Sequence, residues 1–309
     1  MTNSRFWSAY WVLLRPYLLF VSGVSGAAGL ALARDLPAAR FAAAFPAFLF
    51  AYGLGQALTD VFQTDTDAIS APYRPLVRGI VSPHQVLAVS LLGLGVCGAI
   101  LAVLNPWNLA LSAAAIVGLL TYTPAKRRWW AGPFWNAWIV ALLPVMGALC
   151  GRQPAATRLL VPLAASVFFS YAIFVLLGYF KDISADRAAG YRTLPVRAGW
   201  RPSVAASAAL LVAAAGAGVA YFAALGRPPA IGIALWLAGT GLMALAHAQM
   251  WKTNGEKEAH RSIANTVRGY MLLHLGEMVA ARAALWPAAL AFYAAFEWAL
   301  AARPERSQV

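Results

Sequence analysis

Long apolar runs dominate this 309-residue sequence and recur at short intervals along it. Each approaches or exceeds the length that an α-helix needs to cross the hydrocarbon core of a bilayer. The runs cover residues 16–33, 39–62, 85–104, 106–123, 133–150, 158–180, 202–224, 229–250 and 284–302. They are continuous and rich in Ala, Leu and Val, unlike the alternating pattern of a membrane β-barrel. The sequence therefore predicts an all-α, multi-pass membrane protein with about nine transmembrane helices.

Basic residues are distributed unevenly among the connections between these runs. The connections after the second, fourth, sixth and eighth runs carry most of the Lys and Arg that lie between runs, and the other four carry few. Basic loops of membrane proteins face the cytoplasm, so we expect the N terminus and the basic connections there. The net charge of +13 is thus mainly topological and does not indicate a nucleic-acid partner.

Acidic residues are rare, and most of those before residue 255 form two clusters. The first cluster is Asp60, Asp65 and Asp67, and the second is Asp182 and Asp186. Each ends an apolar run and leads directly into a basic loop. Carboxylates are costly at a membrane boundary and are rarely kept there without a partner. Two such clusters, each followed by arginines, indicate divalent metal ions that hold a phosphorylated ligand.

Helical spacing places carboxylates of each cluster on a common face. Asp60 and Asp67 are seven residues apart with Gln63 between them on that face, and the second pair is four residues apart. Asp65 points elsewhere and ranks below the others. Mg²⁺ keeps several waters and takes one or two carboxylates plus phosphate oxygens, so these oxygen ligands suit it. A carboxylate at a solvated helix end is the alternative for any single Asp.

Basic side chains beside the clusters supply a means of holding phosphate. Arg74 and Arg78 follow the first cluster, and Lys181, Arg187 and Arg192 flank the second. Guanidinium groups bind phosphate oxygens with two parallel hydrogen bonds. The combination predicts a site for a Mg²⁺-bound diphosphate.

The chain has no linker or low-complexity tract, so we interpret residues 1–309 as one domain. A faint repeat relates YRPLVRG, after the second run, to YRTLPVRAG, after the sixth. The two copies are four runs apart and therefore on the same membrane face. Such a parallel repeat would bring both acidic clusters together across a central cavity.

Residues 252–283 differ from the rest of the chain. They begin with a polar stretch and continue as a helix with Arg268, His274, Glu277 and Arg282 among apolar residues. This pattern favours a helix at the membrane interface, or one lining a wet cavity, over a helix facing lipid. His274 and Glu277 share a face; a hydrated interfacial helix with local ion pairs is favoured over a base on the acceptor side.

Both acidic motifs resemble signatures of the UbiA superfamily of intramembrane prenyltransferases. The first family signature, N-D-x-x-D-x-x-x-D with a following R-P segment, is similar to residues 59–67 with Arg74 and Pro75. The second, D-x-x-x-D with a following G-x-x-T-L, is similar to residues 182–194. A Y-x-x-x-K/R element lies between them in the family, and here its positions are Tyr122, Lys126 and Arg127, with Asn136 downstream. The resemblance is specific over roughly residues 10–200.

This sequence departs from the first signature at two positions. Thr59 stands where the family has Asn, and Gln63 stands where it has Asp. Gln63 can still offer a neutral oxygen to Mg²⁺ or to a bound water. The loss of one carboxylate leaves the number of bound metals open.

The resemblance implies nine helices around a central cavity, capped by cytoplasmic loops and open laterally to lipid. It implies Mg²⁺ held by Asp60, Gln63, Asp67, Asp182 and Asp186. It implies a diphosphate held by Arg74, Arg78, Arg127, Lys181 and Arg192. Catalytic roles fall to the four matched aspartates with Tyr122 and Lys126, and substrate contacts to Gln63, Asn136 and Tyr179. The expected partners are an isoprenyl diphosphate, membrane lipid and a lipophilic acceptor.

Three functions are compatible with these residues. The leading hypothesis is transfer of an isoprenyl group from an allylic diphosphate to a lipophilic, aromatic acceptor. The second is a membrane terpene cyclase, in which the chain's own double bond captures the cation after the same ionisation. The third is a transporter with intramembrane carboxylate ion sites, against which the position of the acids at the ends of the runs argues.

Overall fold

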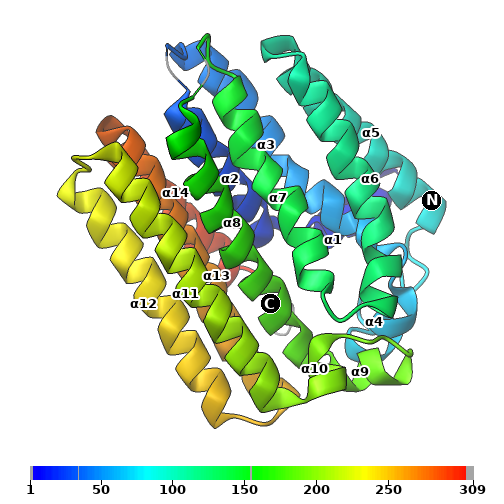
Figure 1. Ribbon diagram of the computed structural model, residues 1–309. Helices are drawn as coiled ribbons and strands as arrows, with labels where there is room; N and C mark the ends of the chain where they lie inside the picture. Colours follow the sequence, from blue (N-terminus) through cyan, green and yellow to red (C-terminus); the bar gives the residue numbers. More distant parts are fainter. Residues whose placement is uncertain (1–2, 34, 154, 304–309) are drawn as a thin grey trace.

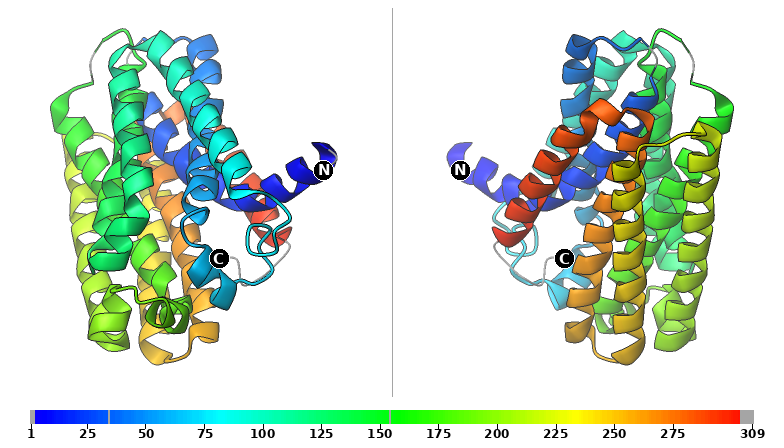
Figure 2. Two further views of the ribbon diagram at one scale, coloured as in Figure 1. Left: turned by 90° about the vertical axis from the view of Figure 1, so that its right-hand side faces the viewer. Right: turned by 90° about the vertical axis from the view of Figure 1, so that its left-hand side faces the viewer.

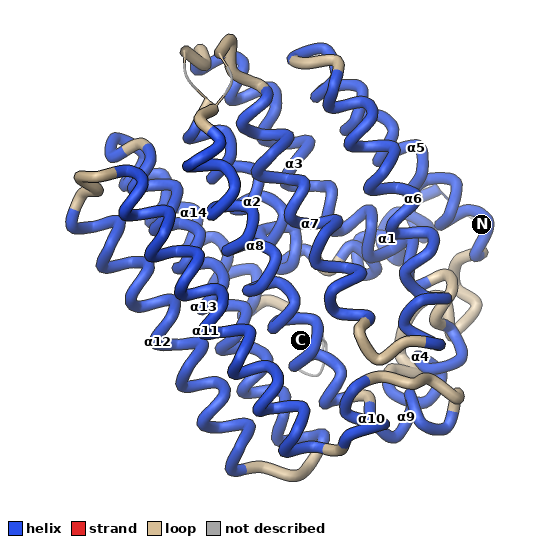
Figure 3. Tube along the Cα trace, viewed as in Figure 1, coloured by secondary structure: helices blue, strands red, loops and turns tan. Residues whose placement is uncertain are grey.

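The computed structural model describes residues 3–33, 35–153 and 155–303. Over these ranges the chain forms helices joined by short loops and turns, which confirms the all-α prediction (Figure 3). Ten long helices build the bundle seen in Figure 1. They are α2 (Leu19–Leu32), α3 (Ala38–Asp60), α5 (Pro83–Leu104), α6 (Trp107–Arg128), α7 (Gly132–Leu149), α8 (Thr157–Gly178), α11 (Trp200–Leu225), α12 (Ala230–Lys252), α13 (Glu256–Ala281) and α14 (Trp286–Ala301).

The count of membrane spans agrees with the sequence prediction. Among the residues that the structure describes, eight helices are long and apolar enough to cross a bilayer, and a bent pair, Ser4–Leu14 with Pro16–Leu32, brings the number to as many as nine. The pair bends by 47° at Arg15, which precedes a proline and has a left-handed backbone, with φ of 49°. Because proline disfavours the α conformation in the residue before it, the helix cannot run straight through this point. The protein is therefore a multi-pass integral membrane protein.

The N-terminal helix α1 (Asn3–Leu14) projects from the bundle (Figure 2). Trp7 and Trp11 on this helix are about half exposed. Tryptophan rings gather at the boundary between lipid and water, so these two rings are suited to anchor α1 at that boundary. The bend at Arg15 thus separates a peripheral helix from the bundle, and the Arg15 side chain itself is buried.

Glycines allow the helices that enclose the centre of the bundle to approach closely. A Cβ at Gly29 of α2 would lie 2.2 Å from the backbone oxygen of Pro144 in α7. A Cβ at Gly239 of α12 would lie 2.4 Å from the backbone nitrogen of Leu273 in α13. Small residues of this kind are the usual means of close helix packing in membranes, where lipid provides no hydrophobic drive.

Helix α13 is inside the bundle, where it packs against α2, α8 and α12. Of the two places predicted for the helix in residues 252–283, the membrane interface is therefore wrong, and the expectation that the helix does not face lipid is confirmed. The other predicted place was beside a cavity, and Ile263 of α13 does line the cavity described below. His274 and Glu277 are completely buried. The polar side chains are tolerated there because α8 supplies hydrogen-bond partners. The composition of residues 252–283 alone cannot reveal those partners. Helix α14 then slants back across the outside of the bundle (Figure 2).

Three short helices, α4 (Thr64–Ser70), α9 (Ile183–Ala188) and α10 (Leu194–Ala198), gather at one end of the bundle (Figure 1). They belong to the loops that follow α3 and α8, and α4 contacts α9. These loops carry the two acidic clusters. Both clusters therefore lie at the same end, as the parallel repeat predicts. We call this end the cap end.

Candidate active site

A cavity opens at the cap end between the loops and the inner faces of the helices. Ten of the predicted site residues line it: Asp60, Gln63, Asp67, Arg74, Tyr122, Lys126, Asn136, Tyr179, Lys181 and Asp182. They come from α3, α4, α6, α7, the segment after α8 (η2, Tyr179–Lys181) and the loop before α5. The structure thus brings both acidic clusters and the central tyrosine–lysine element together around one cavity.

Asp60, the last residue of α3, is the centre of a buried group of cations. Nη2 of Arg15 lies 3.0 and 2.9 Å from its two carboxylate oxygens, and the Gln56 amide donates a hydrogen bond to one of them at 2.7 Å. Nη1 of Arg74 lies 3.7 Å from Asp60 and makes a closer ion pair with Asp67. Two carboxylates of the first cluster, those of Asp60 and Asp67, therefore converge on Arg74.

Lys126 connects the two acidic clusters. Its Nζ lies 3.2 Å from Asp186 of the second cluster and donates a hydrogen bond to Oε1 of Gln63 in the first at 3.3 Å. The rings of Tyr179 and Tyr191 are each 4.9 Å from the same nitrogen, a distance at which an aromatic face attracts a cation. Because Gln63 is neutral, it accepts from Lys126 without neutralising it.

Aromatic hydroxyls form the wall next to Lys126. The hydroxyls of Tyr122 and Tyr179 are 2.8 Å apart, which joins α6 to the segment after α8. The ring of Tyr179 therefore faces the Lys126 ammonium while its hydroxyl is held by Tyr122.

Burial shifts the protonation of the acids in the cap loops. It raises the pKa of Asp67 to about 6, with Arg74 opposing the rise and Asp60 adding to it. Burial also raises the pKa of Asp186, which the Lys126 ammonium opposes. Both shifts express the cost of holding carboxylates away from water, which a bound cation would offset.

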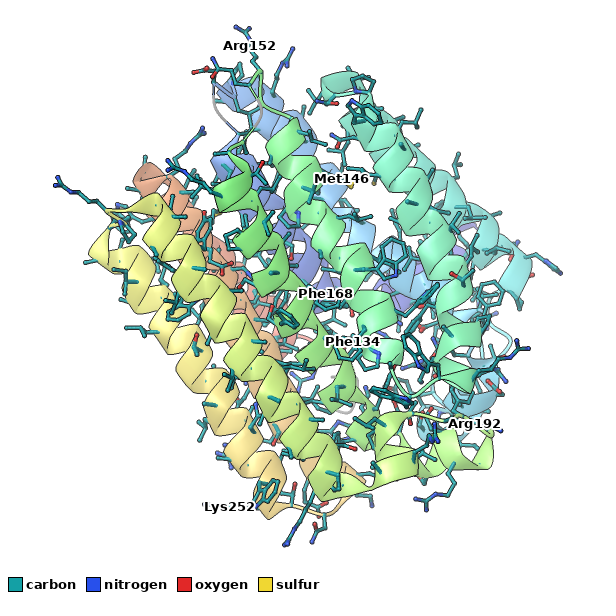
Figure 4. All side chains as sticks on the ribbon, viewed as in Figure 1. Phe134, Met146, Arg152, Phe168, Arg192 and Lys252 are labelled. Atoms are coloured by element: carbon teal, nitrogen blue, oxygen red, sulfur yellow. The ribbon has the colours of Figure 1, made fainter. Side chains whose placement is uncertain are left out.

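Four predicted residues lie outside the cavity lining. Asp186 is buried behind Lys126 and accepts a hydrogen bond from Thr193 at 3.2 Å. Arg127 forms a half-exposed ion pair with Asp65 at 2.7 Å. Arg78 and Arg192 are exposed, and Arg192 lies at the edge of the cap end in Figure 4. The positions of Arg78, Arg127 and Arg192 do not support the predicted contact with diphosphate, because none of these side chains lines the cavity.

Several lining residues were absent from the predicted site. Arg15, Tyr52, Gln56, Tyr171 and Phe174 all line the cavity. Helical spacing carried a signal for two of them, since residues 52, 56 and 60 of α3 are four apart and share a face. Arg15 is the cation next to the proline at the head of the first apolar run. No motif or spacing in the sequence pointed to the two aromatic residues of α8, Tyr171 and Phe174.

The residues of the cavity fit a magnesium ion together with phosphate. Within the described ranges, no three His, Cys, Asp or Glu side chains come close enough to form a metal site alone. Mg²⁺ needs only one or two carboxylates when phosphate and water complete its shell. One buried donor, Nε of Arg74, makes no hydrogen bond to the described residues. The site therefore offers converging carboxylates and an unused donor rather than a closed protein cage.

His274 and Glu277 form a second buried polar group, apart from the cavity. Nδ1 of His274 lies 2.6 Å from Glu277, and its Nε2 lies 2.8 Å from Ser170 of α8. The Ser166 hydroxyl donates to the other Glu277 oxygen at 2.5 Å. The predicted local ion pair is present, but both side chains are completely buried and neither lines the cavity. Its position supports neither hydration nor a base beside the acceptor.

Comparison with known proteins agrees with this architecture. The model of the UbiA prenyltransferase family matches residues 19–276. A digeranylgeranylglyceryl phosphate synthase from Halobacterium salinarum is 33% identical over 254 residues, which cover 80% of this chain and 84% of the relative. A solved UbiA homologue from Aeropyrum pernix superposes with a TM-score of 0.70 at 23% identity, covering 85% of this chain and 97% of that one.

A second solved homologue was captured with ligands. This UbiA homologue from Archaeoglobus fulgidus, bound to DMAPP and Mg²⁺, superposes with a TM-score of 0.67 at 17% identity and covers 85% of this chain and 98% of its own. At that identity the likeness shows a common fold. The family match spans most of the chain, and the relatives it joins are prenyltransferases. This chain therefore belongs to the UbiA prenyltransferase family and is a membrane-embedded prenyltransferase.

Proposed function

We propose that the enzyme ionises an allylic isoprenyl diphosphate in the cap-end cavity and transfers the isoprenyl group to a lipophilic acceptor, with Mg²⁺ as cofactor. The observation that carries this proposal is the balanced set of buried and half-buried charges around one cavity in a membrane protein. The carboxylates are Asp60, Asp67, Asp182 and Asp186, and the cations are Arg15, Arg74, Lys126 and Lys181. A diphosphate with its metal adds little net charge to such a set.

The residues present divide the work of holding the donor. Asp60, Asp67 and Asp182 line the cavity and are the proposed metal ligands, with Gln63 as a neutral oxygen beside them. Bound Mg²⁺ would withdraw negative charge from the diphosphate as it leaves. Arg74 is close to the carboxylates of Asp60 and Asp67, and its Nε is free to donate to a phosphate oxygen.

The side chains around the cavity then favour ionisation of the bond between the allylic carbon and the diphosphate. The bond between the allylic carbon and the diphosphate oxygen breaks, and its electron pair leaves with the diphosphate. Lys126 and Arg74 are already fixed by ion pairs, so they stabilise that charge without reorganising. Tyr52 and Tyr171 offer electron-rich faces to the carbon. The acceptor supplies the electron pair of the new bond, and a carboxylate or water takes the proton that the acceptor loses.

The acceptor is proposed as a lipophilic molecule, since the cavity lies inside a membrane bundle. The aromatic acceptor predicted from the sequence is one class to test. The Halobacterium salinarum relative is named for a glyceryl phosphate lipid product, so a glyceryl phosphate lipid is the other. The cyclase remains the alternative without an acceptor, motivated by Gln63 in place of a carboxylate.

Purified protein in nanodiscs, supplied with Mg²⁺ and geranyl or geranylgeranyl diphosphate, tests the proposal. We expect Mg²⁺-dependent diphosphate release that requires an acceptor and yields a prenylated adduct. Aromatic and glyceryl phosphate acceptors are supplied in separate reactions. Release without acceptor, with a cyclic terpene as product, would support the cyclase. No release from any donor by folded protein would reject both functions.

We propose that the cap end faces the cytoplasm. The support is the concentration of basic connections at this end, including Arg192 and Lys252, with Arg152 at the other end (Figure 4). Single substitutions Arg192→Cys and Arg152→Cys test the orientation with a membrane-impermeant thiol reagent on intact cells. We expect labelling of Cys at 152 alone, relative to the background of the unsubstituted protein. Labelling at 192 alone would reverse the orientation.

Restoring a carboxylate at position 63 is expected to strengthen Mg²⁺ binding. Gln63→Asp adds a negative charge at a cavity-lining position between the two clusters. A further charged oxygen ligand raises affinity, and we expect a decrease of several-fold to about tenfold in the Mg²⁺ concentration for half-saturation. Calorimetric Mg²⁺ titration with an unreactive donor analogue measures it. Gln63→Asn is the control, because it keeps the neutral amide, and an equal shift in both variants would contradict the argument.

A further inference from the structure

Helix α9 carries both carboxylates of the second acidic cluster, because Asp182 is its N-cap residue and Asp186 lies within it. The helix has only six residues. A helix this short is not stable by itself, so its position depends on contacts with the rest of the protein. Asp186 provides one such contact, since it pairs with Lys126 and accepts a hydrogen bond from Thr193. The N-terminal end, beside Asp182, has a different attachment.

Asp182 does not cap the helix that it begins. An aspartate in the N-cap position ordinarily accepts a hydrogen bond from the backbone N–H two or three residues further along the chain. Within α9, every residue of which the structure describes, the Asp182 side chain caps no backbone N–H. It lines the active-site cavity instead. The carboxylate of a proposed metal ligand is therefore left available to the cavity.

Glu256, the first residue of α13, takes the place of that cap. The backbone N–H of Ser184, which an aspartate at position 182 would ordinarily reach, donates to Oε1 of Glu256 at 2.6 Å. The Ser184 hydroxyl donates to Oε2 of the same carboxylate at 2.8 Å. The two residues are 72 positions apart in the sequence. Hydrogen bonds to an ionised carboxylate are stronger than neutral ones, so this contact fixes the start of α9 although Ser184 is exposed.

Helix α13 connects this contact to the wall of the active site. Ile263, two turns after Glu256, lines the active-site cavity. The same helix packs inside the bundle against α2, α8 and α12. Glu256 is therefore held by a well-packed helix, and α9 is attached to an element that itself forms part of the cavity.

We propose that Glu256 is a positioning residue for the second acidic cluster: it caps α9 in place of Asp182 and so frees Asp182 to bind Mg²⁺. This inference rests on the proposed function. Without the Glu256 carboxylate, Asp182 is in the position from which an aspartate accepts the Ser184 N–H. We expect its side chain to turn from the cavity to its own helix. The metal site then loses a ligand although the ligand residue is unchanged.

Mg²⁺ binding tests this assignment independently of turnover. The measurement is calorimetric titration of Glu256→Ala with Mg²⁺ in the presence of geranyl thiolodiphosphate, an unreactive donor analogue. We expect the Mg²⁺ concentration for half-saturation to rise by about fivefold, the effect of losing a helix cap. Glu256→Gln keeps one acceptor oxygen for the Ser184 N–H and should give an intermediate value. Glu258→Ala, the same change at an exposed position in the same turn of α13, is the matched control and should match the unsubstituted protein.

A double variant shows whether Glu256 acts through Asp182. In an Asp182→Asn background the carboxylate ligand is already lost. Adding Glu256→Ala should then change the Mg²⁺ concentration for half-saturation by less than about twofold, because two residues that act through one contact are not additive. A rise of the same size in both backgrounds would mean that Glu256 acts by its charge alone, and it would overturn the inference.

The outcomes separate this inference from the proposed function. If the unsubstituted protein binds no Mg²⁺ with the analogue, the proposed function fails and the inference fails with it. If the unsubstituted protein binds Mg²⁺ and Glu256→Ala binds it equally well, the inference alone is wrong. The inference also fails if Glu256→Ala loses helix content while its Mg²⁺ affinity is unchanged, because Glu256 is then a structural contact only.

Discussion

Asp60→Asn is expected to lower kcat/KM for diphosphate release by at least about a hundredfold. Asp60 is 2% exposed and is approached by two guanidinium groups, those of Arg15 and Arg74, and by the Gln56 amide. The substitution removes a proposed metal ligand and the counter-charge that holds both arginines in place. The rate should stay low at saturating donor, and the Mg²⁺ requirement should rise. Diphosphate release across a Mg²⁺ series measures both effects.

Asp65→Asn is the matched control, the same chemical change in the same acidic cluster. Asp65 pairs with Arg127 at the surface, where both side chains are 40% exposed. Exposed ion pairs contribute about 0–1 kcal/mol, so activity should stay within about threefold of the unsubstituted protein. Equal losses in the two variants would show that the cluster acts through its overall charge rather than through the position of Asp60.

Glu277→Leu is expected to destabilise the bundle by about 3 kcal/mol, the second large effect. The substitution leaves His274 and the Ser166 hydroxyl without their shared partner in a completely buried place. The double variant His274→Leu/Glu277→Leu should recover most of that loss, because no charge is then left unpaired. Reversible unfolding in mixed detergent micelles gives both values.

The more exposed ion pair Arg268–Glu297 is the control for the His274 and Glu277 variants. Its side chains are about one third exposed, so Glu297→Leu should cost less than about 1 kcal/mol. A double variant that is no more stable than Glu277→Leu would mean that the pair is not the cause, and that leucine does not fit the space on α13. Circular dichroism spectra of the folded variants should show the same helix content in all of them.

Several features of the fold and site could be predicted from sequence because their physical causes are local. The apolar runs fix most of the spans, and the clusters at Asp60 and Asp182 follow from rare charges at the ends of two runs. The choice among the arginines could not be predicted in this way. Arg15 enters the cavity through a bend before a proline, whereas Arg78 and Arg192 are turned outward by loops whose paths depend on tertiary contacts.

Helix α13 shows more clearly what the composition of a segment cannot predict, namely that a polar helix is buried in the bundle. Its charged and polar residues disqualify it as a span by hydropathy, yet Ser166 and Ser170 of α8 satisfy the most deeply buried of them. Those partners are over a hundred residues away in sequence. Tyr171 lines the active site for a similar reason, because its position depends on how α8 packs against its neighbours. Long-range partners of this kind leave no periodic pattern.

The polarity of α13 also bears on how the protein is made. As a nascent segment it would partition poorly into lipid, since each charged residue near a helix centre costs about 2.5–3.5 kcal/mol during translocon-mediated insertion. Helices α8 and α12, which supply its partners, leave the ribosome first, whereas α14 follows. We therefore expect that α13 does not insert into the bilayer as an independent segment. It enters by packing against helices that have already inserted.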